Sequence, residues 1–194
     1  MIRGRGEHSS EHSDNSSLHL MGMSKLAVPV SAKDHVEGSD KASVTLVEYG
    51  DYQCPSCGEA YPIVKKLQKH FGERLRFVFR NFPLEMHPWA EHAAEAAEFA
   101  AAKGKFWEMH DALFSHQTRL ADSSLLRLAE GIGLKGEELG KALEAGTYSA
   151  KVKADFAGGV KSGVTGTPMF YLNGQRYDDS YDYETLAAAI EALL

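Results

Sequence analysis

The chain has 194 residues, of which 43% are hydrophobic and 25% charged, and its formal net charge is −6. This length predicts one domain with a sizeable core, and the composition excludes a disordered chain, a collagen-like fibre and a disulfide-rich miniprotein. The negative charge argues against nucleic acid as a partner. The chain contains only two cysteines, Cys54 and Cys57, and they stand three positions apart.

The first thirty residues are polar, and their beginning is rich in His and Ser. They lack the apolar run of about 7–15 residues and the cleavage site of a secretory signal. We therefore expect a disordered tail over residues 1–30 and a cytoplasmic protein, with a periplasmic or other extracytoplasmic address as the alternative. Met21–Gly22–Met23 has the form of a second start, so residues 1–22 are interpreted as an upstream extension. No segment reaches the roughly 18 apolar residues of a membrane span.

Two strands and a helix are predicted in the first part of the chain. Residues 43–49 are rich in β-branched and aromatic side chains and end at a Gly-Asp turn, which is typical of a strand. Pro55 begins a helix whose apolar side chains recur at helical spacing up to Gly72. Residues 75–82 alternate apolar side chains with arginines, and this period of two predicts a second strand.

No further clear strand is predicted before Met169. The expected helices in between cover residues 88–103, 106–113, 123–131, 136–145 and 148–162. A crossover between two parallel strands requires only about a dozen residues, so this stretch is interpreted as a helical subdomain inserted into another fold. Within it, the aromatic side chains of Trp89, Phe99, Phe106 and Trp107 are expected in the core. Glu91, Glu95 and Glu98 are expected on a solvated helix face.

A hairpin and a final helix complete the chain. Residues 169–172 and 175–177 are joined by Asn173–Gly174, a pair that supplies the two positive φ angles of a type I′ turn. The last helix places Leu186, Ile190 and Leu193 on one face, and Asp182 is its expected N-cap. The order of elements is typical of an α/β protein.

The segment Cys54–Pro55–Ser56–Cys57 lies where the first strand passes into the first helix. A sulfur at a helix N-terminus faces unpaired backbone N–H groups and the positive end of the helix dipole, and both stabilise a thiolate. The thiolate is the form that attacks disulfides. We expect Cys54, the more exposed sulfur, to be the nucleophile, and Cys57, one turn into the helix, to be the resolving thiol.

Three other interpretations of the cysteine pair are open. Structural zinc usually takes four ligands, but the chain has no second cysteine pair, and His87 and His92 do not share a helix face. The cysteines are otherwise an unreactive pair at chance spacing, or part of a redox fold that now only binds. We expect no metal and no organic cofactor, because the sulfurs themselves carry the redox equivalents.

Three segments together resemble the DsbA-like thiol:disulfide oxidoreductases, a family with the thioredoxin fold. The segments are VEYGDYQCPSC at residues 47–57, FWEMHDALF at residues 106–114 and VTGTPMF at residues 164–170. The resemblance covers residues 30–194 and implies an α/β thioredoxin fold with an inserted α-helical subdomain between the second and third core strands. The implied parts are the tail (1–30), the first part with the cysteine pair (31–84), the insertion (85–162) and the second part (163–194).

The resemblance assigns two residues to substrate binding. It implies that Pro168 is a cis-proline facing the cysteine pair. The backbone of Thr167 would then be exposed to an extended substrate peptide, which would bind through main-chain pairing with little sequence preference. The plain alternative is a proline that starts a strand.

The resemblance also identifies residues that act on the thiols. Glu48 stands where the family carries an acid beneath the cysteines. A buried carboxyl there would have a raised pKa and could accept or return the proton of Cys57, whereas the alternative is a glutamate reaching solvent. Pro55 and Ser56 are expected to tune the thiols. Strongly oxidising members carry His in place of Ser56, so we expect a less acidic Cys54 in this chain than in those members.

These observations predict a thiol:disulfide oxidoreductase that exchanges dithiols and disulfides on protein or peptide substrates through Cys54 and Cys57. Its expected partners are cysteine-containing substrates and a thiol/disulfide recycling partner, with no nucleic acid and no membrane span, and it is expected to be a monomer or a weak dimer. The alternative is a non-enzymatic redox-sensing or binding domain. A glutathione-linked isomerase is a weaker possibility, because that group does not need Cys57.

Overall fold

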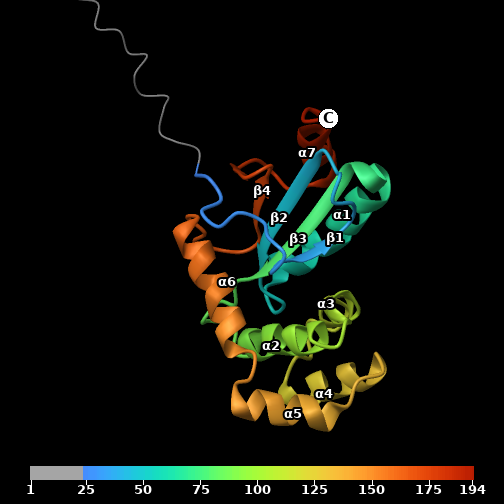
Figure 1. The fold of residues 1–194 in the computed structure, drawn as a ribbon, viewed down its shortest axis with the longest axis vertical. Coiled ribbons are helices and arrows are strands. Elements are labelled where there is room, and N and C mark those ends of the chain that lie inside the picture. The colour runs from blue at the N-terminus through green and yellow to red at the C-terminus, as the bar shows by residue number, and fades with distance from the viewer. Residues whose placement is uncertain (1–23) are drawn as a thin grey trace, which may run out of the picture.

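A computed structural model describes residues 24–194, and its centre is a five-stranded sheet in the order β1-β3-β2-β4-β5 (Figure 1). The strands are β1 (His35–Glu37), β2 (Val44–Gly50), β3 (Leu75–Asn81), β4 (Met169–Leu172) and β5 (Gln175–Tyr177). Strands β2 and β3 are parallel, and every other neighbouring pair is antiparallel. The C-terminal ends of β2 and β3 therefore meet at one edge of the sheet.

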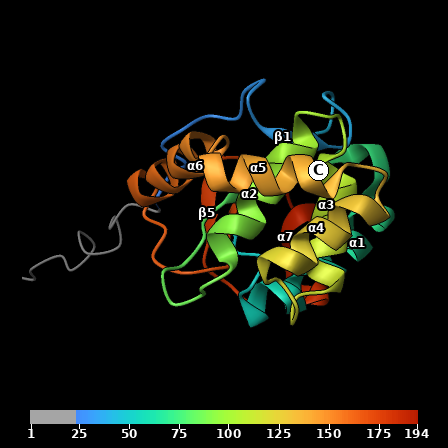
Figure 2. The same cartoon turned by 90° about the horizontal axis from the view of Figure 1, so that it is seen from below.

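The helices cover both faces of the sheet and one of its ends (Figure 1). They are α1 (Pro55–Phe71), α2 (Ala90–Ala101), α3 (Phe106–Ser115), α4 (Asp122–Gly131), α5 (Gly136–Ala145), α6 (Ser149–Lys161) and α7 (Tyr183–Glu191), and a 3-10 turn spans Gly72–Arg74. Helices α1 and α7 lie on one face and α6 on the other. Helices α2 to α5 form a layer beyond the C-terminal ends of β2 and β3, with α4 and α5 outermost (Figure 2). This is a thioredoxin-like α/β fold with a helical insertion between β3 and β4, as expected.

Two apolar clusters fill the two sides of the sheet, because successive side chains of a strand point to opposite faces. The larger one joins Leu46, Phe77 and Phe79 to α1, α7 and the helical layer. The smaller one contains Val47, Tyr49, Val78, Phe82, Val164 and Tyr171. Both faces are therefore covered, and β2 and β3 lie almost entirely in the interior.

Local sequence signals correctly predict the hairpin and the last helix. Asn173 and Gly174 have φ angles of 46° and 80°, as the type I′ turn requires. Asp182 caps α7 by accepting a hydrogen bond from the Thr185 backbone N–H at 2.9 Å. Leu193 is an exception, because it lies beyond the end of α7 and is 44% exposed.

Residues 24–30, expected to belong to a disordered tail, contact the fold. The Leu26 N–H donates to the Gly174 carbonyl at 2.9 Å, and Lys25 forms a β-bridge with Gln175. Leu26 and Val30 pack against the smaller apolar cluster, which explains why this stretch is ordered. The expectations about residues 1–22 lie outside the described residues. Strand β1 was also not predicted, since its three residues show no apolar pattern.

The prediction that the α2 glutamates form one solvated face is wrong for two of them. Glu95 and Glu98 are 4% and 5% exposed, because α2 packs against α3, α4, α5 and α6. The Glu98 carboxylate accepts a hydrogen bond from the Asn81 side-chain amide and lies 2.8 Å from the His35 ring. Burial raises the pKa of Glu95. Trp89, expected in the core, is 39% exposed.

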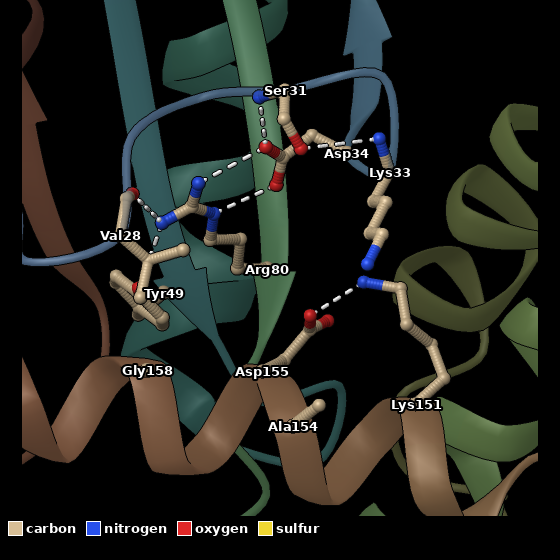
Figure 3. A pocket seen from close by; sticks show the side chains of 10 residues that line it. All are labelled: Val28, Ser31, Lys33, Asp34, Tyr49, Arg80, Lys151, Ala154, Asp155 and Gly158. Atoms are coloured by element: carbon tan, nitrogen blue, oxygen red, sulfur yellow. Dashed lines mark hydrogen bonds and ion pairs between the residues drawn. The ribbon is translucent and has the colours of Figure 1, made fainter.

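A buried ion pair between Arg80 and Asp34 links β3 to the segment before β1 (Figure 3). The Arg80 guanidinium donates two hydrogen bonds to the Asp34 carboxylate, at 2.7 and 3.0 Å. It also donates to the Tyr49 hydroxyl and to the carbonyls of Val28 and Pro29. Burial acts to raise the pKa of Asp34, but the hydrogen bonds from Arg80 and the Ser31 backbone, together with the Arg80 charge, outweigh burial and lower it. Arg80 is therefore buried, although it alternates with the apolar side chains of β3.

We expect Asp34→Asn to lower the free energy of unfolding by about 3–5 kcal/mol, because the variant buries the Arg80 charge without its counter-ion. Urea unfolding monitored by circular dichroism measures the loss. The matched control is Glu137→Gln, which removes an exposed ion pair with Lys141; we expect it to cost less than about 1 kcal/mol. Equal losses in the two variants would contradict a stabilising role for the buried pair.

Candidate active site

The two cysteines occupy the beginning of α1, at the sheet edge where β2 ends. Cys54 is the N-cap residue with extended backbone angles, and Pro55 takes the first helical position, where a proline has no hydrogen bond to lose. Cys54 is 6% exposed and Cys57 is fully buried. As expected, Cys54 is thus the thiol nearer to solvent, and Cys57 lies one turn inside.

The carboxylate of Asp51 shapes the loop that carries Cys54. Its Oδ1 accepts hydrogen bonds from the backbone N–H groups of Gln53 and Cys54, at 2.7 and 3.1 Å. Its Oδ2 accepts from the Leu84 N–H at 2.8 Å and lies 2.7 Å from His87 Nδ1. One side chain therefore ties the cysteine loop to the segment that follows β3.

The backbone of Asp51 also contacts the second thiol, since its N–H donates to Cys57 Sγ at 3.4 Å. Our sequence analysis did not identify this residue. An Asp three positions before a helix N-cap is a signal that could have found it, because Asp side chains commonly accept from backbone N–H groups in turns.

Gln117, from the turn after α3, holds the other side of the same loop. Its side-chain amide donates to the Tyr52 carbonyl at 3.1 Å and to the Cys54 carbonyl at 2.6 Å. Gly58 makes this approach possible, because a Cβ at that position would overlap Gln117 Oε1. The helical insertion thus contacts the reactive cysteine directly.

Thr167 and Pro168 lie on the far side of Cys54. The Thr167–Pro168 peptide bond is cis, and the Thr167 carbonyl oxygen is 3.5 Å from Cys54 Sγ. Thr167 Oγ1 is buried and has no hydrogen-bond partner among the described residues. The structure therefore brings together the cysteines and a segment more than a hundred residues further along the chain.

Glu48 lies inside the sheet, two residues before the end of β2. It is 2% exposed, and its Oε1 has no hydrogen-bond partner in the described part of the chain. Burial raises the pKa of Glu48 to about 8, and the nearby charge of Cys54 contributes to the shift. Glu48 is therefore a buried carboxyl close to the thiols and not a glutamate that reaches solvent.

The two thiols have opposite pKa shifts. The hydrogen bond from the Cys57 side chain is the largest cause that lowers the pKa of Cys54 to about 5, and Thr167 and the backbone N–H groups of Cys57 and Ser56 add to it. Burial raises the pKa of Cys57 well above its usual value. At neutral pH one thiolate therefore stands beside one protonated thiol, which is the arrangement that thiol–disulfide exchange requires.

The residues around the cysteines do not fit a zinc site. The described residues contain no group of three or more His, Cys, Asp or Glu side chains placed to hold a metal ion. His87 is engaged with Asp51, and His92 is engaged with Asp122 at 2.7 Å. Neither histidine makes a hydrogen bond to Cys54 or Cys57 within residues 24–194.

We expect the alkylation rate of reduced Cys54 by iodoacetamide to rise with pH around a midpoint near 5, because only the thiolate reacts and the pKa of Cys54 is about 5. Cys57→Ala should raise the midpoint, since it removes the largest cause of the lowered pKa. Cys54→Ala is the control, and its remaining buried thiol should stay unreactive at pH 7. A midpoint near the ordinary cysteine pKa of about 8.5 would contradict the geometry.

Comparisons with known proteins agree with this geometry. A family model described as thioredoxin matches residues 31–192. A curated relative, the Na(+)/H(+) antiporter NhaA 1 of Salinispora arenicola, is 44% identical over 177 residues. That match covers 88% of this chain but 27% of the relative. The chain spans about a quarter of the length of the curated relatives it matches.

Solved structures share both the fold and its helical insertion. BdbD from Bacillus subtilis is 30% identical with a TM-score of 0.79, and the match covers 85% of this chain and 95% of that one. A thioredoxin-like oxidoreductase from Silicibacter pomeroyi is 29% identical, with a TM-score of 0.74 and coverage of 84% and 92%. The thiol-disulfide exchange protein α-DsbA2 from Wolbachia pipientis, at 21% identity and a TM-score of 0.72 over 84% and 89%, shows the fold alone.

Proposed function

The chain belongs to the thioredoxin family, in its DsbA-like group, and from that premise we propose that it is a thiol:disulfide oxidoreductase acting on protein or peptide substrates. One observation carries the proposal. Cys54 has a lowered pKa and a position near solvent, whereas its partner Cys57 is buried with a raised pKa. This asymmetry separates an attacking sulfur from a resolving one.

The proposed exchange proceeds in two displacements. The Cys54 thiolate attacks one sulfur of a substrate disulfide, forms a mixed disulfide and releases the other substrate sulfur as a thiolate. Cys57 then loses its proton and attacks Cys54, which releases the second substrate thiolate and leaves the Cys54–Cys57 disulfide. Two electrons pass from the protein to the substrate, and a thiol/disulfide recycling partner restores the pair. In the reverse direction, the same steps oxidise a substrate dithiol to a disulfide.

Thr167 and Pro168 are the proposed substrate contacts. A chain joined to Cys54 must pass the Thr167 carbonyl, which is 3.5 Å from Cys54 Sγ. Main-chain pairing there would bind an extended peptide with little regard to its side chains. Pro55 and Ser56 stand between the two cysteines in the sequence, and we propose that they tune the pKa of Cys54.

Glu48 is the proposed proton acceptor for Cys57. The Cys54 thiolate contributes to the raised pKa of Glu48, and this contribution disappears once Cys54 is in a mixed disulfide. The Glu48 carboxyl then ionises more readily, at the step where Cys57 must lose its proton. Glu48 can thus accept the proton of Cys57 inside the buried site.

The lowered pKa of Cys54 favours oxidation of substrates. A stabilised thiolate stabilises the reduced pair, which makes the disulfide form a stronger oxidant. The cytoplasmic address expected from the sequence has no support among the comparisons. The proposal therefore takes the alternative, an extracytoplasmic compartment, where disulfides form and persist. Among the described residues, no helix has the length and apolar character to cross a membrane.

We expect the protein to turn over a disulfide-linked peptide repeatedly in the presence of a thiol reductant such as glutathione. Cys54→Ser should abolish turnover because it removes the nucleophile. Cys57→Ser should trap a mixed disulfide between Cys54 and the peptide, visible as an added mass on a non-reducing gel. A single stoichiometric oxidation of the pair without turnover would overturn the enzymatic proposal.

A single oxidation of the pair without turnover would support a second candidate function, that of a redox-sensing or binding domain. The match to about a quarter of the length of a Na(+)/H(+) antiporter favours this second candidate. In that relative, a similar domain belongs to the same chain as a transporter. In that case the oxidation state of Cys54 and Cys57 would alter the affinity for a partner.

We expect Glu48→Gln to slow the release of substrate from the mixed disulfide by about 100-fold, since proton transfer by a positioned group contributes at least that much. Quenched-flow kinetics with a fluorescent peptide measures the release. The first attack by Cys54 should change far less. Equal effects on both steps would contradict a specific role for Glu48 in the proton transfer.

Stability against pH provides a second readout on the same variant. Between pH 4.5 and about 8, the unfolded chain releases the Glu48 proton while the folded protein keeps it, so this group lowers the wild type's stability as pH rises. The Glu48→Gln variant lacks this loss of stability with rising pH. Its stability relative to the reduced wild type should therefore increase across that range, which shows that slower release does not come from misfolding.

A further inference from the structure

A basic pocket lies between α3 and α4, outside the site described above. It has a volume of about 440 Å³, within the range of small-ligand sites. His116, Arg119 and Arg127 line it together with Ser124, and Ala112, Leu128, Gly131 and Ile132 complete its wall. No acidic side chain lines this pocket.

The charges in the pocket are free to bind a ligand. Within residues 24–194, neither Arg119 nor Arg127 has a carboxylate within ion-pair distance, although acidic residues outnumber basic ones in the chain. Arg127 is oriented by a hydrogen bond to Ser124 Oγ at 3.1 Å. His116 donates from Nδ1 to the Ala112 carbonyl, so its Nε2 remains available. Arginine side chains bind carboxylates with two parallel hydrogen bonds.

The pocket borders the turn that holds the cysteine loop. Its residues His116 and Arg119 belong to the turn after α3, which a hydrogen bond from the Arg119 N–H to the His116 carbonyl closes at 2.8 Å. The same turn carries Gln117, whose side chain donates to the Cys54 carbonyl. Two residues that line the pocket are thus within two positions of a residue that contacts Cys54.

We infer that this pocket binds carboxylates of the substrate close to its reacting cysteine, so that the protein prefers acidic substrates. The inference rests on the proposed exchange reaction and specifies its substrate class. The apolar part of the wall, from Ala112, Leu128 and Ile132, accommodates the stem of a Glu side chain or an apolar neighbour. The carboxylates belong either to acidic side chains of a peptide or to a glutathione group, which carries the same chemistry.

The experiment compares two disulfide-linked peptides that differ only in two Glu or two Gln residues flanking the cysteine. We expect the wild-type kcat/KM to be about fivefold higher for the Glu peptide, which corresponds to about 1 kcal/mol for two exposed ion pairs. High salt should reduce this preference. Arg119→Gln with Arg127→Gln should abolish it without changing turnover of the Gln peptide. Lys141→Gln, which removes one positive charge elsewhere on the insertion, should preserve it.

A charge-reversed variant distinguishes a loss of the pocket from misfolding of the protein. Arg119→Glu with Arg127→Glu should prefer a peptide with two Lys residues, and an unfolded protein cannot show that gain. Oxidised glutathione is the second arm. A loss of its turnover in the double Gln variant assigns the pocket to the small thiol, and a loss confined to the Glu peptide assigns it to a protein substrate.

The outcomes test the inferred pocket and the proposed exchange reaction separately. Equal kcat/KM for the Glu and Gln peptides in the wild type, together with unchanged turnover of oxidised glutathione in the double Gln variant, overturns the pocket and leaves the exchange reaction standing. Turnover of neither peptide overturns the exchange reaction. Binding of serine-for-cysteine versions of the two peptides, measured by fluorescence anisotropy, then decides the pocket. Tighter binding of the Glu version that is lost in the double Gln variant supports it, and equal binding overturns it.

Discussion

The buried carboxylate of Asp51 is the constraint on which the geometry of the cysteines depends. Strand β2 ends one residue earlier, and the chain must turn into α1 within four residues. Turning exposes backbone N–H groups that have no partner in either element, and a buried donor left unpaired costs about 1–3 kcal/mol. Asp51 satisfies three such groups, two from the cysteine loop and one from Leu84. The position of Cys54 is therefore fixed by hydrogen bonds to the backbone of its loop and not by its sulfur.

Two buried acids at the end of β2 show how surroundings decide the role of a carboxyl group. Asp51 is surrounded by donors and serves as a structural acceptor. Glu48, three residues earlier, has a buried oxygen without a partner, and burial raises its pKa to about 8. A carboxyl kept protonated near neutral pH avoids the cost of a buried charge. The same residue is therefore tolerable in the sheet interior and suited to exchanging a proton with Cys57.

The sequence predicts those features that depend on short-range rules. Asn173–Gly174 specifies a turn through its own backbone preferences, and Pro55 at a helix start places the cysteines at the N-terminus of α1. Burial of polar side chains follows from long-range packing and was not predictable. Glu98 and Arg80 have the local pattern of exposed residues, yet partners distant in sequence, Asn81 and Asp34, hold them in the interior. Gln117 belongs to the same class, because its partners lie some sixty residues earlier in the chain.

The topology explains why the insertion takes part in the site. Parallel strands β2 and β3 end at the same edge of the sheet, so a segment inserted directly after β3 begins beside the cysteine loop that follows β2. Leu84 and His87 occupy that beginning, and both contact Asp51. The turn after α3 returns to the same place with Gln117. The thioredoxin core thus supplies the sulfurs, the buried acid and the Thr167–Pro168 segment, and the insertion holds the cysteine loop through His87 and Gln117. The carboxylate pocket that we infer lies on this insertion, so our proposal assigns substrate choice to the insertion and the sulfur chemistry to the core.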